Sequence, residues 1–306
     1  MEPLLEGLEK TSYREGNTRV KVFGKGFKKS DILNEALNQA RVEETGLRIP
    51  KLLEVRKVDN RWAIVTEFVE GETLQSLMEA HPEQLESYME QFVLLQKEIQ
   101  SKRSPLLTKL KDKMNRKISQ SGLDATIRYD LHTRLSAMHD HIKVCHGDFN
   151  PSNVIVDKDG RLYVIDWSHA TQGNGSADAA RTYLMFRLNG RDDWAELYLK
   201  MFCDMNDVAK QYVSQWLPIV AASQLSKENP QAYCRMARVF DAVIGKICRK
   251  DVRKKMRDKL LEALHPYNKT EVENISLFQN FFRNKKQAQQ NSLHLLFFKG
   301  SPKKNP

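Results

Sequence analysis

A short polar stretch near the middle of the chain constrains the fold more than any other feature. The letters HGDFNPSN occupy residues 146–153, and VIDW follows at residues 164–167. Between them, two apolar runs flank the turn Lys158-Asp159-Gly160, and this pattern predicts a short β-hairpin. Polar side chains therefore cluster at both ends of the hairpin.

The spacing of the polar residues in this stretch indicates a particular chemistry. Asp148 and Asn153 are five residues apart, and Asp166 lies thirteen residues further on. Phosphoryl transfer needs an acceptor for the proton of the substrate hydroxyl and hard oxygen ligands for Mg²⁺. The D-x-x-x-x-N spacing followed by a second Asp matches the catalytic loop and the metal-binding Asp of protein kinases. The alternative is an Asx-rich turn beside a hairpin, with carboxylates that are merely solvated.

The same letters carry a resemblance to known proteins. HGDFNPSNVIV and VIDW resemble the signature of the aminoglycoside phosphotransferase and choline kinase families, which share the protein-kinase-like fold. The resemblance implies that Asp148 is the catalytic base and that Asn153 and Asp166 hold Mg²⁺. It makes His146 a residue that braces the loop, with a general base as the alternative role. The resemblance spans residues 10–185, is only generic for the following helices, and fails after about residue 266.

The upstream half of the chain agrees with this resemblance. The alternating letters TRVKVF at Thr18–Phe23 predict a strand, with Lys21 in its middle. Glu35, on the helix that follows, resembles the partner in the Lys–Glu pair that positions the α- and β-phosphates of a nucleotide. We therefore expect an ion pair between Lys21 and Glu35. Lys21 as a solvated edge residue is the alternative, and Glu43 and Glu44 are other partners on the same helix.

The first 70 residues predict a small sheet interrupted by that one helix. Ser30-Asp31 offers an N-cap, apolar residues follow at helical spacing, and Gly46 is a plausible stop. Lys51–Val58 and Trp62–Phe68 read as two further strands that are joined by an Asp59-Asn60 turn. Residues 74–140 and 177–265 are mostly helical in pattern, without an internal repeat.

Two further segments of this part concern the nucleotide. Residues 67–74 (EFVEGETL) resemble the hinge of the kinase-like fold, where Glu67 and Val69 would offer backbone groups to an adenine or guanine edge. A plain linker between strand and helix is the alternative. The chain has no G-x-G-x-x-G, so the candidate phosphate-covering loop is residues 10–13, where Ser12 and backbone N–H groups could approach the phosphates. This loop is short for the family.

The acceptor of the phosphate is less well marked. Asp178, in the letters SADAA, resembles a helix start that braces the catalytic loop, and an ordinary N-cap explains it equally. The later helices carry acids and aromatic residues that could hold a cationic acceptor, or could be solvated acids and core aromatics. These residues are Asp192, Asp193, Asp204, Asp207, Trp194, Tyr198 and Trp216. An aminoglycoside, an amino alcohol, a sugar and a protein hydroxyl all remain as candidate acceptors.

Charge and composition narrow the remaining choices. Residues 246–306 carry fifteen Lys/Arg and five Asp/Glu, whereas residues 1–245 carry 34 of each, so the whole net charge of +10 lies at the C-terminal end. Lys246, Arg249, Lys250, Arg253 and Arg257 recur at helical spacing and would form a cationic stripe that could dock an anionic partner, or a solvated face. A neutral body argues against a nucleic-acid-binding module for the main domain.

Two absences complete the sequence-based expectations. The chain has no run of 18 apolar residues and no CxxC pair among its four cysteines. We therefore expect a cytoplasmic protein with reduced thiols and no membrane association. Nothing in the sequence indicates the oligomeric state.

We thus predict a bilobal, protein-kinase-like α+β fold. Residues 1–70 would form the N-lobe, residues 71–265 the C-lobe, and residues 266–306 a basic and partly disordered tail. The expected activity is that of a Mg²⁺-dependent small-molecule kinase, which moves the γ-phosphate of ATP or GTP to a hydroxyl of a small-molecule acceptor. A nucleotide-binding pseudoenzyme of the same fold is the alternative. Deletion of residues 267–306 would leave activity intact on this interpretation.

Overall fold

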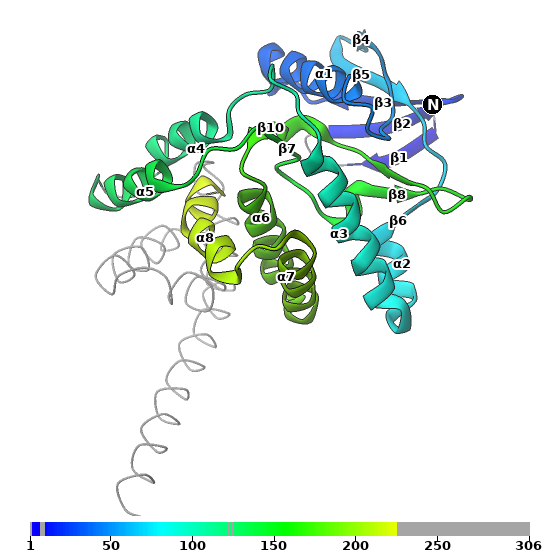
Figure 1. Cartoon of the computed structure of the whole chain (residues 1–306). Coiled ribbons are helices and arrows are strands. Elements are labelled where there is room, and N and C mark those ends of the chain that lie inside the picture. Colours follow the sequence, from blue (N-terminus) through cyan, green and yellow to red (C-terminus); the bar gives the residue numbers. More distant parts are fainter. Residues whose placement is uncertain (1, 7–9, 122, 124, 225–306) are drawn as a thin grey trace, which may run out of the picture. The chain divides into compact units, whose positions relative to one another are not determined.

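The N-terminal part of the chain is a five-stranded antiparallel sheet with one helix packed on it. The computed structural model describes residues 2–6, 10–121, 123 and 125–224 (Figure 1). The order of the strands in the sheet is β1-β2-β3-β5-β4, and helix α1 (Lys29–Glu43) connects β3 to β4. The strands are β1 (Glu2–Glu6), β2 (Lys10–Glu15), β3 (Thr18–Phe23), β4 (Leu52–Val58) and β5 (Arg61–Glu67).

Alternation along the central strands separates the two faces of this sheet. Val20 and Val22 of β3 are buried with residues of β5 in one cluster. Phe23 of β3 and Ile64 of β5 belong to a second cluster that contains Ile32 and Ala36 of α1. A strand turns successive side chains to opposite faces, whereas a helix repeats one face every three to four residues. The helix therefore covers one face of the sheet, as the sequence pattern predicts.

The turns of the sheet follow from residues that tolerate a left-handed backbone. Asp59 and Asn60, between β4 and β5, have φ angles of 48° and 61°. Two consecutive residues of positive φ are the mark of a type I′ hairpin turn, for which Asn and Asp are well suited. The predicted strands at 18–23 and on both sides of the Asp59-Asn60 turn are thus confirmed, within one residue at each end for the second pair.

Two local predictions for this part are wrong. Residues 10–13 are strand β2 and not a loop, because Ser12 pairs with Lys21 of β3 and Tyr13 pairs with Val20 across the antiparallel register. Residues 7–9, which precede β2, lie outside the described residues. Helix α1 begins at Lys29, and Lys28 stands at its N-cap without a side-chain hydrogen bond, so Ser30-Asp31 lies in its first turn.

After the N-terminal sheet, the described residues up to 224 form mainly helices with five short strands (Figure 1). Strands β6, β8 and β9 form one small sheet, and β7 pairs with β10 in another. The helices of four or more residues are α2 (Leu74–Ala80), α3 (Leu85–Ser101), α4 (Leu110–Ser119), α5 (Ala125–Ala137), α6 (Gly175–Leu188), α7 (Asp192–Asn206) and α8 (Lys210–Gln224). The strands are β6 (Glu72–Thr73), β7 (Lys143–Cys145), β8 (Val154–Val156), β9 (Leu162–Val164) and β10 (Thr171–Gly173).

The predicted hairpin between the two polar strings is present as β8 and β9, with Gly160 in its turn at a φ of 75°. Strand β6, which follows β5 after four residues, adds to the edge of β8. Gly71 stands at this junction, where a Cβ atom would lie 2.1 Å from the carbonyl oxygen of Val156. Only glycine fits so close a backbone approach.

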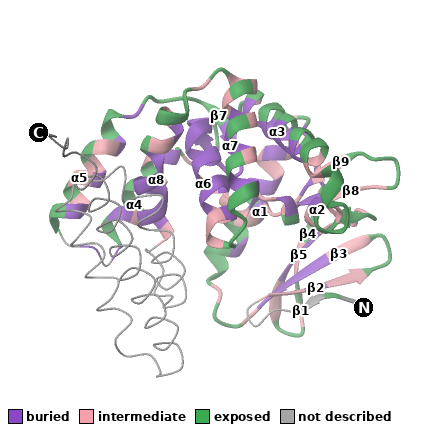
Figure 2. Cartoon of the chain, turned by 90° about the horizontal axis from the view of Figure 1, so that it is seen from below, coloured by how far each residue is buried: buried purple, intermediate pink, exposed green. Residues whose placement is uncertain are grey.

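Helix α6 lies at the centre of the buried core of this part (Figure 2). Ten of its fourteen residues are buried, and it contacts both α7 and α8. Phe149 of the catalytic loop stacks on Phe92 of α3, with ring centroids 4.3 Å apart. A packed aromatic core therefore holds the loop that carries Asp148 in place.

Some predictions concern residues that the structure does not describe. The helical pattern of residues 225–265, the cationic stripe and the basic tail at 266–306 all lie outside the described residues. Within residues 2–224, apart from the gaps, no helix is both long and apolar enough to cross a bilayer.

Candidate active site

The backbone of the catalytic loop is held by the first turn of α6. Asp178 accepts hydrogen bonds from the backbone N–H groups of His146, at 3.0 Å, and Gly147, at 2.7 Å. Burial raises the pKa of Asp178, against the lowering effect of His146 and of these two donors. Asn174, the N-cap of α6, supplies the usual cap by accepting from the Ser176 N–H. Asp178 therefore braces the loop, as the sequence suggested, and is not the N-cap.

His146 connects the catalytic loop to the strand that leads to Asp166. Its Nδ1 accepts from the Asp148 N–H at 3.2 Å, and its Nε2 lies 3.0 Å from the carbonyl oxygen of Ile165. This pattern defines the tautomer with the proton on Nε2. The residue is fully buried. Because both ring nitrogens are engaged, His146 has the position of a brace and lacks a free nitrogen for a general base.

Gly147 is required by both backbone conformation and space. Its φ is +78°, and a Cβ atom there would lie 2.5 Å from the carbonyl oxygen of His169. Gly160, in the β8–β9 turn, has nearly the same φ of +75° but nothing within 4 Å of its Cβ position. The two glycines therefore separate the cost of backbone strain from the cost of a steric clash.

We expect Gly147→Ala to destabilise the protein more than Gly160→Ala. The left-handed conformation costs a non-glycine residue about 1–2 kcal/mol at either site, and only Gly147 adds a backbone clash. Urea unfolding of the two variants measures the difference in the free energy of unfolding. Equal losses at the two positions would contradict the close packing of the catalytic loop on His169.

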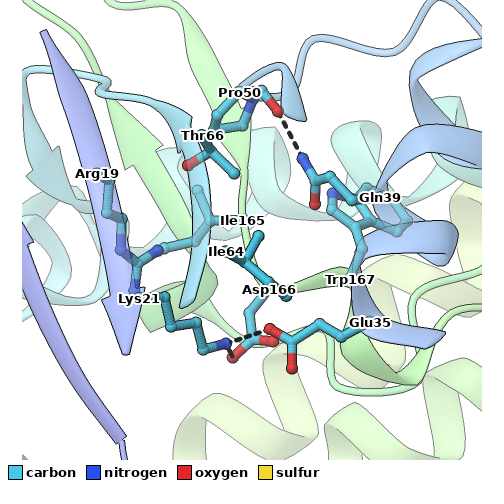
Figure 3. A pocket seen from close by; sticks show the side chains of 10 residues that line it. All are labelled: Arg19, Lys21, Glu35, Gln39, Pro50, Ile64, Thr66, Ile165, Asp166 and Trp167. Atoms are coloured by element: carbon cyan, nitrogen blue, oxygen red, sulfur yellow. Dashed lines mark hydrogen bonds and ion pairs between the residues drawn. The ribbon is translucent and has the colours of Figure 1, made fainter. Parts of the chain in front are cut away.

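Lys21 lies between two carboxylates in a pocket that residues of the N-terminal sheet, α1 and the segment after β9 line (Figure 3). Its Nζ is 2.6 Å from Oε1 of Glu35 and 3.3 Å from Oδ2 of Asp166. The predicted ion pair with Glu35 is thus present, and Glu43 is instead bonded to the backbone of Leu52. The pairing joins the sheet, α1 and the loop after β9 at one point.

Asp166 has the conformation and charge state of a functional residue. Its φ and ψ are 62° and 63°, which is the left-handed region that non-glycine residues rarely adopt. Although burial raises the pKa of Asp166, the charge of Lys21 and a hydrogen bond from Ser168 hold it far below its usual range. Its Oδ1 is buried without a hydrogen-bond partner among the described residues. The carboxylate is therefore ionised, with one oxygen unoccupied.

Asp148 and Asn153 face each other across the turn of the catalytic loop. The amide nitrogen of Asn153 donates to the carbonyl oxygen of Asp148 at 2.9 Å and lies 3.4 Å from its Oδ2. Arg181 of α6 binds the other carboxylate oxygen, Oδ1, at 2.8 Å. Oδ2 is consequently the less engaged oxygen of Asp148.

These side chains suit Mg²⁺ only together with a nucleotide. The free Oδ1 of Asp166 and the amide oxygen of Asn153 are hard oxygen donors of the kind that Mg²⁺ prefers. Among the described residues, no group of three or more His, Cys, Asp or Glu side chains could hold a metal ion by itself. In kinase sites the remaining ligands are phosphate oxygens and water, so the residues present fit that arrangement.

The sequence also predicted that Ser12, Glu67 and Val69 contact the nucleotide, and the structure shows where each of them lies. Ser12 is buried in β2, and its Oγ accepts from Arg19, so it is not part of a loop over phosphates. Glu67 holds the edge of the sheet, because its Oε2 accepts from the Lys51 N–H. Val69 lies in the segment between β5 and β6 that has no regular structure. The pocket wall is instead completed by Arg19, which the sequence analysis missed (Figure 3).

Comparison with known proteins agrees with this geometry. The profile of the phosphotransferase enzyme family matches residues 2–212, which is more than half of the chain. The chain belongs to the phosphotransferase enzyme family. No curated protein sequence matches it, so the family membership rests on the profile and the fold.

Solved structures of the same fold include aminoglycoside and choline kinases. A thermostable mutant of aminoglycoside phosphotransferase APH(4)-Ia has 17% identity and a TM-score of 0.60, over 81% of this chain and 94% of its own. Choline kinase LicA from Streptococcus pneumoniae has 16% identity and a TM-score of 0.52, over 87% and 95% of the two chains. The first protein has also been solved with ADP and hygromycin B. At these identities the likeness shows the kinase-like fold.

The sequence analysis missed the cations that surround the site of this phosphotransferase. Lys10 of β2 lies 3.4 Å from Oε2 of Glu35, so Glu35 holds two lysines. Arg181 binds Asp148, and Thr182 bonds the carbonyl oxygen of Phe149 at 2.6 Å. Asp178, Arg181 and Thr182 are spaced three and four residues apart, so they share one face of α6. This spacing was a readable signal, because residues at i, i+3 and i+4 share a helix face.

Lys113 of α4 is another missed cation of the phosphotransferase. Its Nζ donates to the carbonyl oxygen of His169 at 2.8 Å. Burial and the nearby charges of Lys117 and Arg181 lower the pKa of Lys113 to about 7. The unfolded chain, with an ordinary lysine pKa near 10.5, therefore holds a proton that the folded chain gives up between pH 7 and 10.5.

We expect this proton difference to appear in the pH dependence of stability. Relative to Lys113→Met, the wild type should gain up to about 1 kcal/mol of unfolding free energy per pH unit between pH 7 and 9. Urea unfolding at both pH values measures this gain. Lys200→Met, at an exposed lysine of α7, is the matched control. A constant gap between the wild type and Lys113→Met would mean that Lys113 keeps an ordinary pKa.

Proposed function

We propose that this phosphotransferase is a Mg²⁺-dependent small-molecule kinase that transfers the γ-phosphate of ATP or GTP to a substrate hydroxyl. The observation that carries the proposal is the position of Lys21 between Glu35 and Asp166, at 2.6 Å and 3.3 Å. A cation held in this way can bind nucleotide phosphates without moving, which lowers the cost of binding. The kinase-like fold of the neighbouring structures supports the same conclusion.

In the proposed reaction, Asp148 receives the proton of the acceptor hydroxyl at Oδ2. Arg181 holds Oδ1 and thereby fixes the plane of the carboxylate. A bond forms between the acceptor oxygen and the γ-phosphorus while the bond from that phosphorus to the β–γ bridging oxygen breaks, and the nucleoside diphosphate leaves. The rate enhancement would come from positioning and electrostatic stabilisation, since the protein forms no covalent bond in this step.

Asp166 and Asn153 would hold Mg²⁺ against the nucleotide. When bound, the ion supplies charge neutralisation for the phosphate oxygens. Asp166 can serve because it is ionised and has one oxygen without a partner. The amide nitrogen of Asn153 donates to the carbonyl oxygen of Asp148, so its amide oxygen would be the atom that binds the ion.

The segment after β5 would contact the nucleobase. The N–H of Phe68 donates to the carbonyl oxygen of Asn17 at 3.0 Å, which fixes the start of this segment on the sheet. Gly71 contacts the backbone of β8 and fixes its end. Val69 lies between these two points, and its backbone groups would pair with the edge of an adenine or guanine.

A nucleotide-binding pseudoenzyme is the second candidate. Two observations favour it, namely the ion pair that engages Asp148 with Arg181 and the guanidinium of Arg19 in the wall of the nucleotide pocket. In that case the protein would bind nucleotide but would not transfer phosphate to any hydroxyl.

An ADP-release assay over a panel of hydroxyl metabolites separates the two candidates. The assay is run with ATP and with GTP, each with and without Mg²⁺, on the full-length wild type. We expect acceptor-dependent release that requires Mg²⁺. Nucleotide binding by calorimetry without acceptor-dependent release would support the pseudoenzyme, and absence of nucleotide binding would contradict both.

A further inference from the structure

A second hollow of the molecule lies directly beside the catalytic loop. It is bordered by helices α4, α6 and α8 together with Gly147 and His169. Gly147 precedes the proposed base in the chain. Arg181 both lines this hollow and binds Asp148 at 2.8 Å. Asp148 is not part of the lining, and Arg181 therefore connects this hollow, which we call the acceptor pocket, to Asp148.

The charged side chains of the acceptor pocket are mainly cations. Lys113 and Lys117 stand at i and i+4 on α4, which places them on the same helix face, and Arg181 approaches from α6. Ser223 and Gln224, at the end of α8, add neutral polar groups. The charges of Lys117 and Arg181 disfavour the charged form of Lys113, and an anion bound in the hollow would favour that form.

The described residues that line the pocket offer no carboxylate for a cationic ligand. Asp178 is the one acidic residue among the described residues that line it, and both of its oxygens already accept from the backbone of His146 and Gly147. Burial lowers the pKa of Lys113 most, and the nearby charges of Lys117 and Arg181 lower it further. Such a cluster of like charges is expected where a site is arranged for a ligand of opposite sign.

The acids and aromatics that could have held a cationic acceptor lie elsewhere. Asp192 is paired with Arg187 at 2.9 Å and Asp204 with Lys200 at 3.0 Å. Trp194, Tyr198 and Trp216 are buried core residues. None of these side chains, nor Asp193 or Asp207, lines the acceptor pocket. These positions agree with the alternative interpretation, in which the residues are solvated acids and core aromatics.

We propose that the acceptor carries a phosphate or carboxylate group, which binds Lys113, Lys117 and Arg181 while its hydroxyl faces Asp148. This inference rests on the proposed function, because it names the substrate class of the same site. It separates this chain from the neighbours named for choline and aminoglycosides, which are cations. Arg181 would bind both Asp148 and the acceptor anion, because its guanidinium has several donors in a fixed fork.

A binding measurement tests the pocket without any turnover. The full-length protein is saturated with a non-hydrolysable ATP analogue, which fills the nucleotide phosphate positions, and is then titrated with inorganic phosphate by calorimetry. We expect saturable binding that weakens about tenfold in Lys113→Met and in Lys117→Met, the loss typical of one charge-assisted contact. Lys200→Met, on the exposed face of α7, should bind phosphate as the wild type does.

A second measurement compares matched acceptors. Glycerol, glycerol phosphate, glycerate and a cationic amino alcohol differ mainly in charge and share a free hydroxyl. We expect kcat/KM to be highest for an anionic member, with the phosphate and the carboxylate distinguishing the two sources of the anion. Lys117→Met should lower the ratio of kcat/KM for the anionic acceptor to kcat/KM for glycerol about tenfold.

The outcomes of the two measurements are distinct. Phosphate binding that is absent, or that the two pocket variants leave unchanged, would overturn the anionic acceptor, as would a preference for the cationic amino alcohol. Failure of the ATP analogue to bind would instead overturn the proposed function. In that case the phosphate titration of the nucleotide-free protein and its Lys113→Met variant still decides whether the pocket binds anions.

Discussion

Asp148→Asn is expected to lower kcat by about 10²–10⁴-fold, which is the usual contribution of a general base. The substitution removes the oxygen that would receive the hydroxyl proton but keeps the size and polarity of the side chain. Nucleotide affinity should be nearly unchanged, because Lys21, Glu35 and Asp166 form their contacts without Asp148. Steady-state kinetics with a saturating acceptor measures the change.

The matched control for this substitution is Asp159→Asn. Asp159 lies in the β8–β9 turn, is half exposed and pairs only with Arg161. This variant should retain the turnover of the wild type. Near wild-type turnover of Asp148→Asn would remove Asp148 as the base and would favour a role in holding Arg181.

Asp166→Ala is expected to abolish the Mg²⁺ dependence of nucleotide binding. The substitution deletes a carboxylate that is ionised and has a free oxygen, and it also removes one of the two partners of Lys21. Because even outer partners of a metal site are worth 10- to 100-fold, we expect a loss of about 100-fold or more in affinity for the Mg²⁺–nucleotide complex. Calorimetric titrations with and without Mg²⁺ measure it.

Asp159→Ala serves as the control for this second substitution, since it removes a carboxylate from the same hairpin on its exposed side. Its nucleotide affinity should keep the Mg²⁺ dependence of the wild type. The same Mg²⁺ dependence in Asp166→Ala would show that the ion is held without Asp166.

Local patterns made the catalytic loop and the central sheet predictable. The hairpin between Asp148 and Asp166 depends on a turn and two short apolar runs that are adjacent in sequence. The pairing of Lys21 with Glu35 joins a strand to the next helix, and the alternation and helical spacing that define the two elements also orient these side chains. The resemblance to aminoglycoside and choline kinases then supplied the roles.

Contacts that depend on tertiary packing could not be read in the same way. The segment 10–13 has few strand signals by itself, and it becomes β2 because the neighbouring β3 offers its edge. Arg181 meets Asp148 across 33 residues of chain, through the position of α6 under the loop. The cations of the acceptor pocket come together because α4 packs near the catalytic loop and α8.

The arrangement of side chains around Asp148 also explains why the sequence alone did not indicate which acceptor is phosphorylated. Acidic and aromatic residues are abundant in the later helices, but the structure places them in the core or in ion pairs at helix ends. The sequence did not indicate that lysines of α4 line the acceptor pocket, because exposed and pocket-lining lysines look alike in a helical pattern. Only the arrangement around Asp148 distinguishes them.

The most direct test of the central claim is to follow the γ-phosphate itself. The wild type and Asp148→Asn are incubated with ATP, Mg²⁺ and the panel of neutral, anionic and cationic hydroxyl compounds, and phosphorus NMR records the products. The account predicts a new phosphate monoester on one of the acceptors, which Asp148→Asn forms about 10²–10⁴-fold more slowly than the wild type. Nucleotide that binds but yields no phosphate ester with any acceptor, or ester formed equally by both proteins, would contradict it.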